Sequence, residues 1–168
     1  MDGPLLVAYA SNHGSTREVG EAICRPLEEA GLRAHLRPAM DVRDLDGYDA
    51  VVLGAPIYMG RWHRHAHAFL RRNHRLLAGR PFAVFALGPL HDDAKEWAEA
   101  RAQLDAALAR HGVEPLAVGL FGGRVDPSHL HFPFSKMPPG DARDWSAIAA
   151  WGAALPDALG LRELPVLA

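Results

Sequence analysis

A short run of hydroxyl, amide and glycine residues gives the chain a turn whose residue types suit the binding of an anion. The run consists of Ser11, Asn12, His13, Gly14, Ser15 and Thr16. It lies between the apolar run 5–9 and a helical pattern that starts at Thr16, so a strand would pass directly into a helix. Unpaired backbone N–H groups, the positive end of the helix dipole and the hydroxyls would then favour a phosphate group. The same spacing also fits a simple capped turn with Ser15 as the N-cap.

Several other chemistries are disfavoured by the motifs that the chain lacks. The turn matches neither the G-x-G-x-x-G pattern of dinucleotide sites nor the G-x-x-x-x-G-K-[ST] pattern of nucleoside triphosphate sites. There is no G-x-S-x-G elbow of the kind that hydrolases use. His63 and His67 would share one face of a helix, but their H-x-H-x-H run lacks the Glu of H-E-x-x-H and an evident third ligand. We therefore expect no metal site.

Two hydrophobic periods alternate along the chain and predict strands and helices in turn. The expected strands are 5–9, 33–37, 50–53, 81–87 and 114–121, and the expected helices are 16–31, 62–77, 93–112 and 145–159. Pro26 should bend or divide the first helix. The segment 122–144 contains four Pro and no helical period, so we expect it to be irregular. Five strands joined by crossovers imply a parallel sheet wound on both faces.

In such a sheet, the carboxyl ends of the first, third and fourth strands meet at one edge. The loops 11–16, 54–60 and 88–91 would come together there, and the run 50–53, which is apolar without alternation, suits a strand buried on both faces. The second loop combines apolar, aromatic and glycine residues, which is typical of a segment that lies against a ligand.

The residues of these loops resemble those of the flavodoxin-like family. Its hydroxyl-rich phosphate loop corresponds here to Y-A-S-N-H-G-S-T-R-E, with Ser11 where many flavodoxins carry Thr. The set Y-A-S-x-H-G-S-T, G-A-P-I-Y-M-G-R-W-H and F-G-G-R-V-D-P looks like the flavodoxin-domain proteins similar to menaquinone-dependent protoporphyrinogen oxidase. This resemblance implies an α/β three-layer sandwich with a five-stranded parallel sheet of order 2-1-3-4-5. Helices would cover both faces, and one domain would span residues 1–168.

The resemblance also implies an FMN site at this edge of the sheet, with the phosphate held by the loop 11–16. The isoalloxazine ring would lie between two further sets of residues. The first set is Ala55, Pro56, Ile57, Tyr58, Met59, Gly60 and Trp62, and the second is Leu87, Gly88, Pro89, Leu90 and His91. Tyr58 and Trp62 are candidates for a ring stacked on the flavin, with an ordinary rim position as the alternative. The flavin would carry the catalysis. His63 could donate or accept a proton beside it, or only form a surface hydrogen bond.

A long stretch without acidic residues begins at the third strand and includes a basic helix. No Asp or Glu occurs between Ala50 and His91, whereas this stretch contains Arg61, Arg64, Arg71, Arg72, Arg75 and Arg80. Positive charge stabilises the reduced anion of a flavin and raises its potential, which is opposite to the effect of the acidic residues around low-potential flavodoxins. The stretch favours an organic, anionic electron donor, and the Arg-rich helix could dock a protein redox partner. A solvated helix surface is the alternative.

The run His129–Phe134 has three interpretations: a lid over the flavin, a patch for a quinone or a membrane surface, or a segment whose Phe132 and Phe134 pack back onto the core. In the similar family the region after the fifth strand is commonly more basic and more helical. Here Arg124 and Lys136 are its only Lys or Arg residues before Arg143.

Composition and charge limit the remaining functions. The chain has 168 residues, 49% of them hydrophobic, which suits one core, and its net charge of -2 does not point to nucleic acid. Its one cysteine, Cys24, excludes an internal disulfide and a multi-cysteine cluster and fits a cytoplasmic setting. No apolar run approaches the ~20 residues of a membrane span, so any membrane contact would be peripheral.

We therefore predict an FMN-dependent oxidoreductase. It would take electrons from an organic donor, protoporphyrinogen-like by resemblance, and pass them to a quinone or a protein acceptor. The alternative is a flavodoxin-like module that lacks FMN and acts by binding or regulating a partner. A homodimer is compatible with either function.

Overall fold

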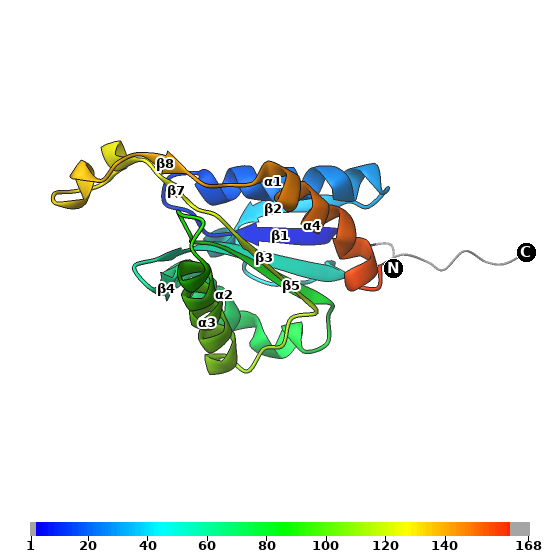
Figure 1. Ribbon diagram of the computed structural model, residues 1–168. Helices are drawn as coiled ribbons and strands as arrows, with labels where there is room; N and C mark the ends of the chain where they lie inside the picture. The colour runs from blue at the N-terminus through cyan, green and yellow to red at the C-terminus, as the bar shows by residue number, and fades with distance from the viewer. Residues whose placement is uncertain (1–2, 162–168) are drawn as a thin grey trace, which may run out of the picture.

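A parallel sheet of buried strands forms the centre of the protein (Figure 1). The computed structural model describes residues 3–161, without the side chain of Phe134. The parallel strands lie in the order β2-β1-β3-β5-β6, which confirms the predicted order 2-1-3-4-5. They are β1 (Leu5–Tyr9), β2 (Ala34–Pro38), β3 (Ala50–Tyr58), β5 (Phe82–Leu87) and β6 (Ala117–Phe121). The short strand β4 (Arg61–Trp62) pairs antiparallel with the end of β3.

Two pairs of helices cover the two faces of the sheet and complete a three-layer sandwich (Figure 1). One face carries α1 (Ser15–Glu29) and α4 (Trp145–Ala158), and the other carries α2 (Arg64–Leu77) and α3 (Ala94–Arg110). The helices contribute mostly aliphatic side chains to the two layers of the core, among them Val19, Ile23, Ile148, Phe69, Leu70 and Leu104. Because both faces are covered, the central strands are apolar throughout, as in the fully buried β5.

Several predicted features of these elements differ from the structure, among them the start of β6, which lies at Ala117 rather than at 114. Helix α1 continues through Pro26 without a break. Pro26 lies in its last turn, where a missing N–H removes only one bond of a helix that is about to end. Strand β3 extends to Tyr58, because residues 54–56, which we expected in a loop, continue the parallel ladder with β5, and residues 57–58 pair with β4 in a hairpin. This hairpin also delays the start of α2 from Trp62 to Arg64.

The segment 122–144 contains more structure than its sequence predicts. Its strands β7 (Arg124–Val125) and β8 (Gly140–Asp141) pair antiparallel, and two short 3-10 helices, η2 (Pro127–His129) and η3 (Phe134–Lys136), lie between them. The Gly123 N–H donates to the Pro89 carbonyl at 2.8 Å, which ties the segment to the loop after β5. It projects beyond the edge at which the parallel strands end (Figure 1). Within residues 3–161, no helix is long and apolar enough to cross a membrane.

Candidate functional site

Two adjoining cavities lie at the carboxyl edge of the sheet. The large cavity, of about 700 Å³, lies between the loop 11–16 and residues 124–132. The small cavity, of about 320 Å³, lies between residues 56–59, the start of the loop after β5 and residues 123–125. Both are lined by Ser15, Pro56, Tyr58, Arg124 and Val125. The three predicted loops therefore do meet, and a fourth wall comes from the segment 122–144.

The turn between β1 and α1 keeps its backbone amides accessible at the start of the helix. Gly14 is the N-cap, with a left-handed φ of 85°, and no side chain caps it, so the capping role predicted for Ser15 is wrong. The Ser11 hydroxyl instead accepts the Gly14 N–H at 2.8 Å and holds the turn. A Cβ at Gly14 would meet no atom within 4 Å, so the space over the turn is open. This is the local geometry of an anion site at a helix N-terminus.

Thr16, in the first turn of α1, has an unsatisfied side chain. The residue is fully buried, and its Oγ1 has no hydrogen-bond partner among the described residues. A buried hydroxyl without a partner destabilises a protein by about 1–3 kcal/mol. Such a group is rare in native structures and points to a ligand that completes it. Thr16 is therefore a sign of a binding site at this turn, although the residue itself lies outside the linings of both cavities.

His63 joins the second loop to the first through its imidazole ring. Its Nδ1 accepts the His65 N–H at 3.0 Å and caps helix α2, which leaves the ring proton on Nε2. Nε2 therefore donates to Asn12 Oδ1, 2.9 Å away, and the Asn12 amide nitrogen is turned away from His63. Burial, with His65 and Arg64 as smaller causes, lowers the pKa of His63 to about 4. A neutral ring with both nitrogens engaged argues against the proton-transfer role predicted for His63.

The second loop offers one of its two predicted aromatic rings to the cavities. Trp62 is 3% exposed, and its Nε1 donates to the Ala55 carbonyl at 3.0 Å, so its ring belongs to the core and the predicted stacking on a flavin is wrong. Tyr58 is 51% exposed and lines both cavities. Met59 forms the tip of the β3–β4 hairpin with a positive φ of 49°, and Gly60 follows with φ 78°. Met59 lines the small cavity, whereas Gly60 and Ala55 lie outside both linings.

The third loop contributes fewer residues than predicted. Leu87, Gly88 and Leu90 line the small cavity, although the Leu87 side chain is buried. Pro89 and His91 lie outside both linings. The His91 ring pairs with the Glu96 carboxylate at 3.0 Å, and the Leu90 N–H donates to the same carboxylate. These contacts hold the loop against the start of α3.

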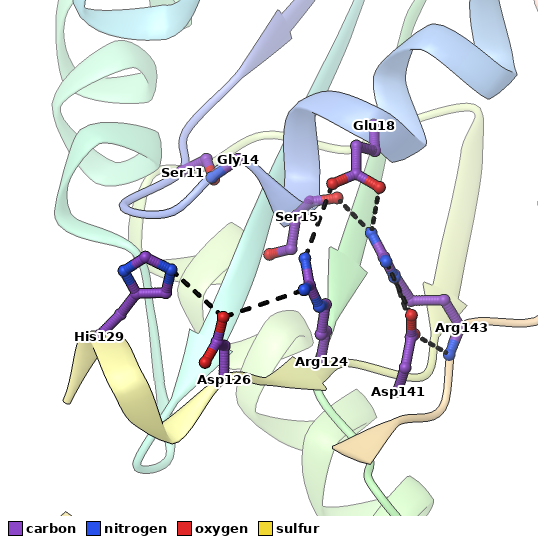
Figure 2. A network of polar contacts seen from close by, with 9 residues as sticks. All are labelled: Ser11, Gly14, Ser15, Glu18, Arg124, Asp126, His129, Asp141 and Arg143. Carbon is purple, nitrogen blue, oxygen red and sulfur yellow. Dashed lines mark hydrogen bonds and ion pairs between the residues drawn. The ribbon is translucent and has the colours of Figure 1, made fainter. Parts of the chain in front are cut away.

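Two arginines of the segment 122–144 contact the first turn of α1 (Figure 2). Arg124 also forms part of the cavity wall that the sequence did not predict. The Arg143 side chain, 4% exposed, forms two bonds of 2.8 Å to Asp141 and reaches the Ser15 carbonyl at 3.2 Å and Glu18 at 3.3 Å. Arg124 faces Glu18 from the other side, with an N–O distance of 3.7 Å. The F-G-G-R-V-D-P match was the signal in the sequence, but it gave no partner for either arginine.

Phe132, at the large cavity, is not packed on the core as one of our interpretations supposed. Phe132 is 75% exposed and lines the cavity, whereas the side chain of Phe134 lies outside the described part. The His129 ring stacks on His13 of the first loop, with centroids 4.6 Å apart and planes 18° apart. The segment 122–144 therefore contacts the loop 11–16 directly.

The basic side chains of α2 divide into structural and exposed groups. Arg72 donates to the Ala39 carbonyl at 3.2 Å, and Arg80, just beyond the helix, donates to the Tyr48 carbonyl at 3.1 Å. His67 contacts His111 at 2.8 Å between ring nitrogens, away from His63. Among the described residues, no three His, Cys, Asp or Glu side chains gather to hold a metal ion.

A doubly wound parallel sheet with a hydroxyl-rich turn at a helix start after its first strand, and two further loops at the same edge, is the arrangement of a flavodoxin-like fold. The sequence model of the flavodoxin domain family matches residues 6–136, and the chain belongs to this family. The fold is similar to oxidised flavodoxin 2 from Bacillus cereus, with a TM-score of 0.63 and 24% identity over 92% of this chain and 98% of that one. It is equally similar to two-electron reduced flavodoxin from Megasphaera elsdenii, with a TM-score of 0.63 and 15% identity over 91% and 98% of the chains.

Curated relatives match more locally. Protoporphyrinogen IX dehydrogenase (quinone) of Escherichia coli strain K12 is 26% identical over 84 residues, which are 49% of this chain and 46% of that protein. S-adenosyl-L-methionine-dependent tRNA 4-demethylwyosine synthase of rice is 31% identical over 141 residues, which are 76% of this chain and 21% of that protein. The chain thus spans less than half the length of the curated relatives it matches.

Membership of the flavodoxin domain family indicates FMN as the cofactor. The residues at the carboxyl edge fit this group. The open turn at Gly14 and the unpartnered Thr16 hydroxyl suit its phosphate, and the small cavity offers the apolar walls that a planar ring requires.

Proposed function

We propose that this protein is an FMN-dependent oxidoreductase that takes electrons from an organic donor and passes them to a quinone or a protein acceptor. The observation that carries this proposal is the large cavity, which extends from the loop 11–16 to residues 124–132. It adjoins the small cavity and leaves room for an organic molecule beside the flavin. The similarity to protoporphyrinogen IX dehydrogenase of E. coli makes a protoporphyrinogen-like donor the first to test.

The chain's own residues would bind and orient the cofactor. The Ser15 and Thr16 hydroxyls and the first amides of α1 would hold the phosphate. The isoalloxazine ring would lie between Ile57–Met59 and Gly88–Leu90, where Tyr58 offers an exposed aromatic face. The bound flavin supplies the electron transfer, and the protein sets its position and electrostatic surroundings.

His63 would act in this site as a positioning residue. Its Nε2–H holds Asn12 Oδ1, so the Asn12 amide nitrogen is available as a donor at the rim of the large cavity. This role replaces the proton transfer that the sequence suggested.

The charge around the large cavity favours an anionic donor. Asp126 is the one carboxylate among the described residues that line it, and Ser128 and His129 already engage that carboxylate. Arg124 and several imidazoles face the same space. A protein acceptor would meet the exposed arginines of α2, such as Arg64 and Arg71.

The midpoint potential of the bound flavin is expected to lie above that of an acidic electron-transfer flavodoxin, because positive charge stabilises the reduced anion. A reductive titration with a reference dye measures it, with an acidic flavodoxin titrated alongside as the control. A potential as low as that of the control would contradict the proposal.

The activity can be tested on the full chain loaded with FMN. After anaerobic mixing with protoporphyrinogen or a simpler carboxylated donor, bleaching of the flavin band would show donor oxidation, and recovery on adding a naphthoquinone would show the acceptor step. If only a protein reductase bleached the flavin, the protein would be an electron shuttle and the proposed donor class would be wrong.

A further inference from the structure

Arg124 differs from every other arginine near the site, because it is the one that lines both cavities in the described part of the chain. Its backbone is fixed by the ladder with β8, where it pairs with Asp141, and by the neighbouring bond between Gly123 and Pro89. The side chain is 36% exposed. A rigid backbone therefore presents a partly exposed guanidinium beside Ser15 and the start of α1 (Figure 2).

The contacts of Arg124 leave its donors available. Its two ion pairs, to Glu18 at 3.7 Å and to Asp126 at 3.9 Å, are longer than hydrogen bonds. Within residues 3–161, its five N–H donors form no hydrogen bond, whereas Arg143 donates to Asp141, Glu18 and the Ser15 carbonyl. Arg143 therefore anchors the segment, and Arg124 is poised for another anion.

The loop 11–16 contains no Lys or Arg, and Glu18 places a negative charge in the first turn of α1, which follows this loop. A flavin phosphate bound at this turn would therefore meet backbone amides and hydroxyls but no formal positive charge from the turn. The guanidinium of Arg124, which faces Ser15 from the opposite wall, is placed to supply that charge. A guanidinium binds phosphate through two parallel hydrogen bonds.

We propose that Arg124, contributed by the segment 122–144 rather than by the phosphate loop, binds the phosphate of the flavin and sets the preference of this protein for FMN over riboflavin. This inference rests on the FMN site proposed above. It assigns the segment a role in selecting the cofactor, in addition to walling the cavities.

The test compares the dissociation constants of FMN and riboflavin, measured by quenching of flavin fluorescence, for the wild type and for Arg124→Gln. The variant is expected to bind FMN more weakly by about ten-fold or more, because charge-assisted hydrogen bonds are lost, and to bind riboflavin as the wild type does. The FMN dissociation constant of Arg124→Lys should lie between those of the wild type and Arg124→Gln, because Lys keeps the positive charge but lacks the two parallel donors of a guanidinium. The salt dependence of FMN binding should also be shallower in Arg124→Gln.

Arg17→Gln is the matched control. Arg17 also lies close to the loop 11–16, in the first turn of α1, but its side chain pairs with Glu21 and lines neither cavity. It should leave both constants unchanged. Arg124→Gln should unfold at the wild-type denaturant concentration, since exposed ion pairs contribute little to stability.

An equal loss for FMN and riboflavin, or no loss for either, would overturn the phosphate role while the FMN site stood. The second result is also the one expected if Arg124 served a substrate anion instead. A wild type that bound no FMN would overturn both this inference and the proposed function.

Discussion

Replacing Thr16 by valine is expected to stabilise the flavin-free protein and to weaken FMN binding at the same time. Valine has nearly the shape of threonine but lacks the hydroxyl, which is buried here without a partner. Removing an unsatisfied buried hydroxyl should raise the free energy of unfolding by about 1 kcal/mol or more. Losing a donor to the phosphate should weaken FMN binding by about 10- to 100-fold.

Denaturant unfolding of the flavin-free protein and a fluorescence titration with FMN measure the two effects. Thr16→Ser keeps the hydroxyl and should bind FMN nearly as the wild type does. Ser11→Ala is the control of opposite sign, because it removes the acceptor of the Gly14 N–H and should lower stability by about 1 kcal/mol. If Thr16→Val lowered the stability of the flavin-free protein, the hydroxyl would have a partner in solution and the argument would fail.

The opposite effects of Thr16→Val on stability and on FMN affinity follow from the structure of the loop 11–16. The turn leaves a buried hydroxyl and uncapped helix amides, which cost stability until an anion completes them, and it leaves open space at Gly14 for that anion. The surrounding sheet compensates, because its strands are buried on both faces. A binding site of this kind is a local departure from the rules that the rest of the chain obeys.

The parts of the structure that the sequence predicts are those decided by neighbours along the chain. The turn 11–16 was recognisable because its residue types, the preceding strand and the following helix are contiguous. The parallel sheet followed from the alternation of periods, and its strand order from the family resemblance. The extension of β3 was missed because Gly54 and Pro56 suggest a loop, whereas pairing of these residues with β5 overrides that local preference. The β3–β4 hairpin follows at Ile57 and Tyr58.

The contacts that complete the site join residues far apart in sequence, and no local pattern reveals them. Asn12 and His63 are 51 residues apart, and Arg143 reaches Glu18 across 125 residues. Trp62 looked like a rim aromatic because its neighbours are polar, and only the tertiary structure shows that its ring turns into the core. The tautomer of His63 likewise depends on a helix start that the sequence placed two residues too early.

His63→Ala is expected to lower both stability and FMN affinity, but by separable routes. The variant loses the acceptor that caps α2, which should reduce the free energy of unfolding by about 1–2 kcal/mol. It also frees Asn12, so FMN binding should weaken by about ten-fold if the Asn12 amide contacts the cofactor. In an Asn12→Ala background, His63→Ala should have no further effect on FMN affinity but should still lower stability, because the cap of α2 is lost there too. An undiminished loss of FMN affinity in that background would show that His63 does not act through Asn12.

The same residue makes stability depend on pH in a predictable direction. His63 stays neutral in the folded protein down to a pKa of about 4, whereas in the unfolded chain it takes up its proton near pH 6.5. Between these values the unfolded state binds more protons, so the contribution of His63 is fully present above pH 6.5 and is lost as the pH falls toward 4. His63→Gln cannot titrate, and its Nε2–H can still reach Asn12. Its denaturant unfolding should therefore depend less steeply on pH than that of the wild type across this window, and equal slopes would mean that the pKa of His63 is the same in the folded protein as in the unfolded chain.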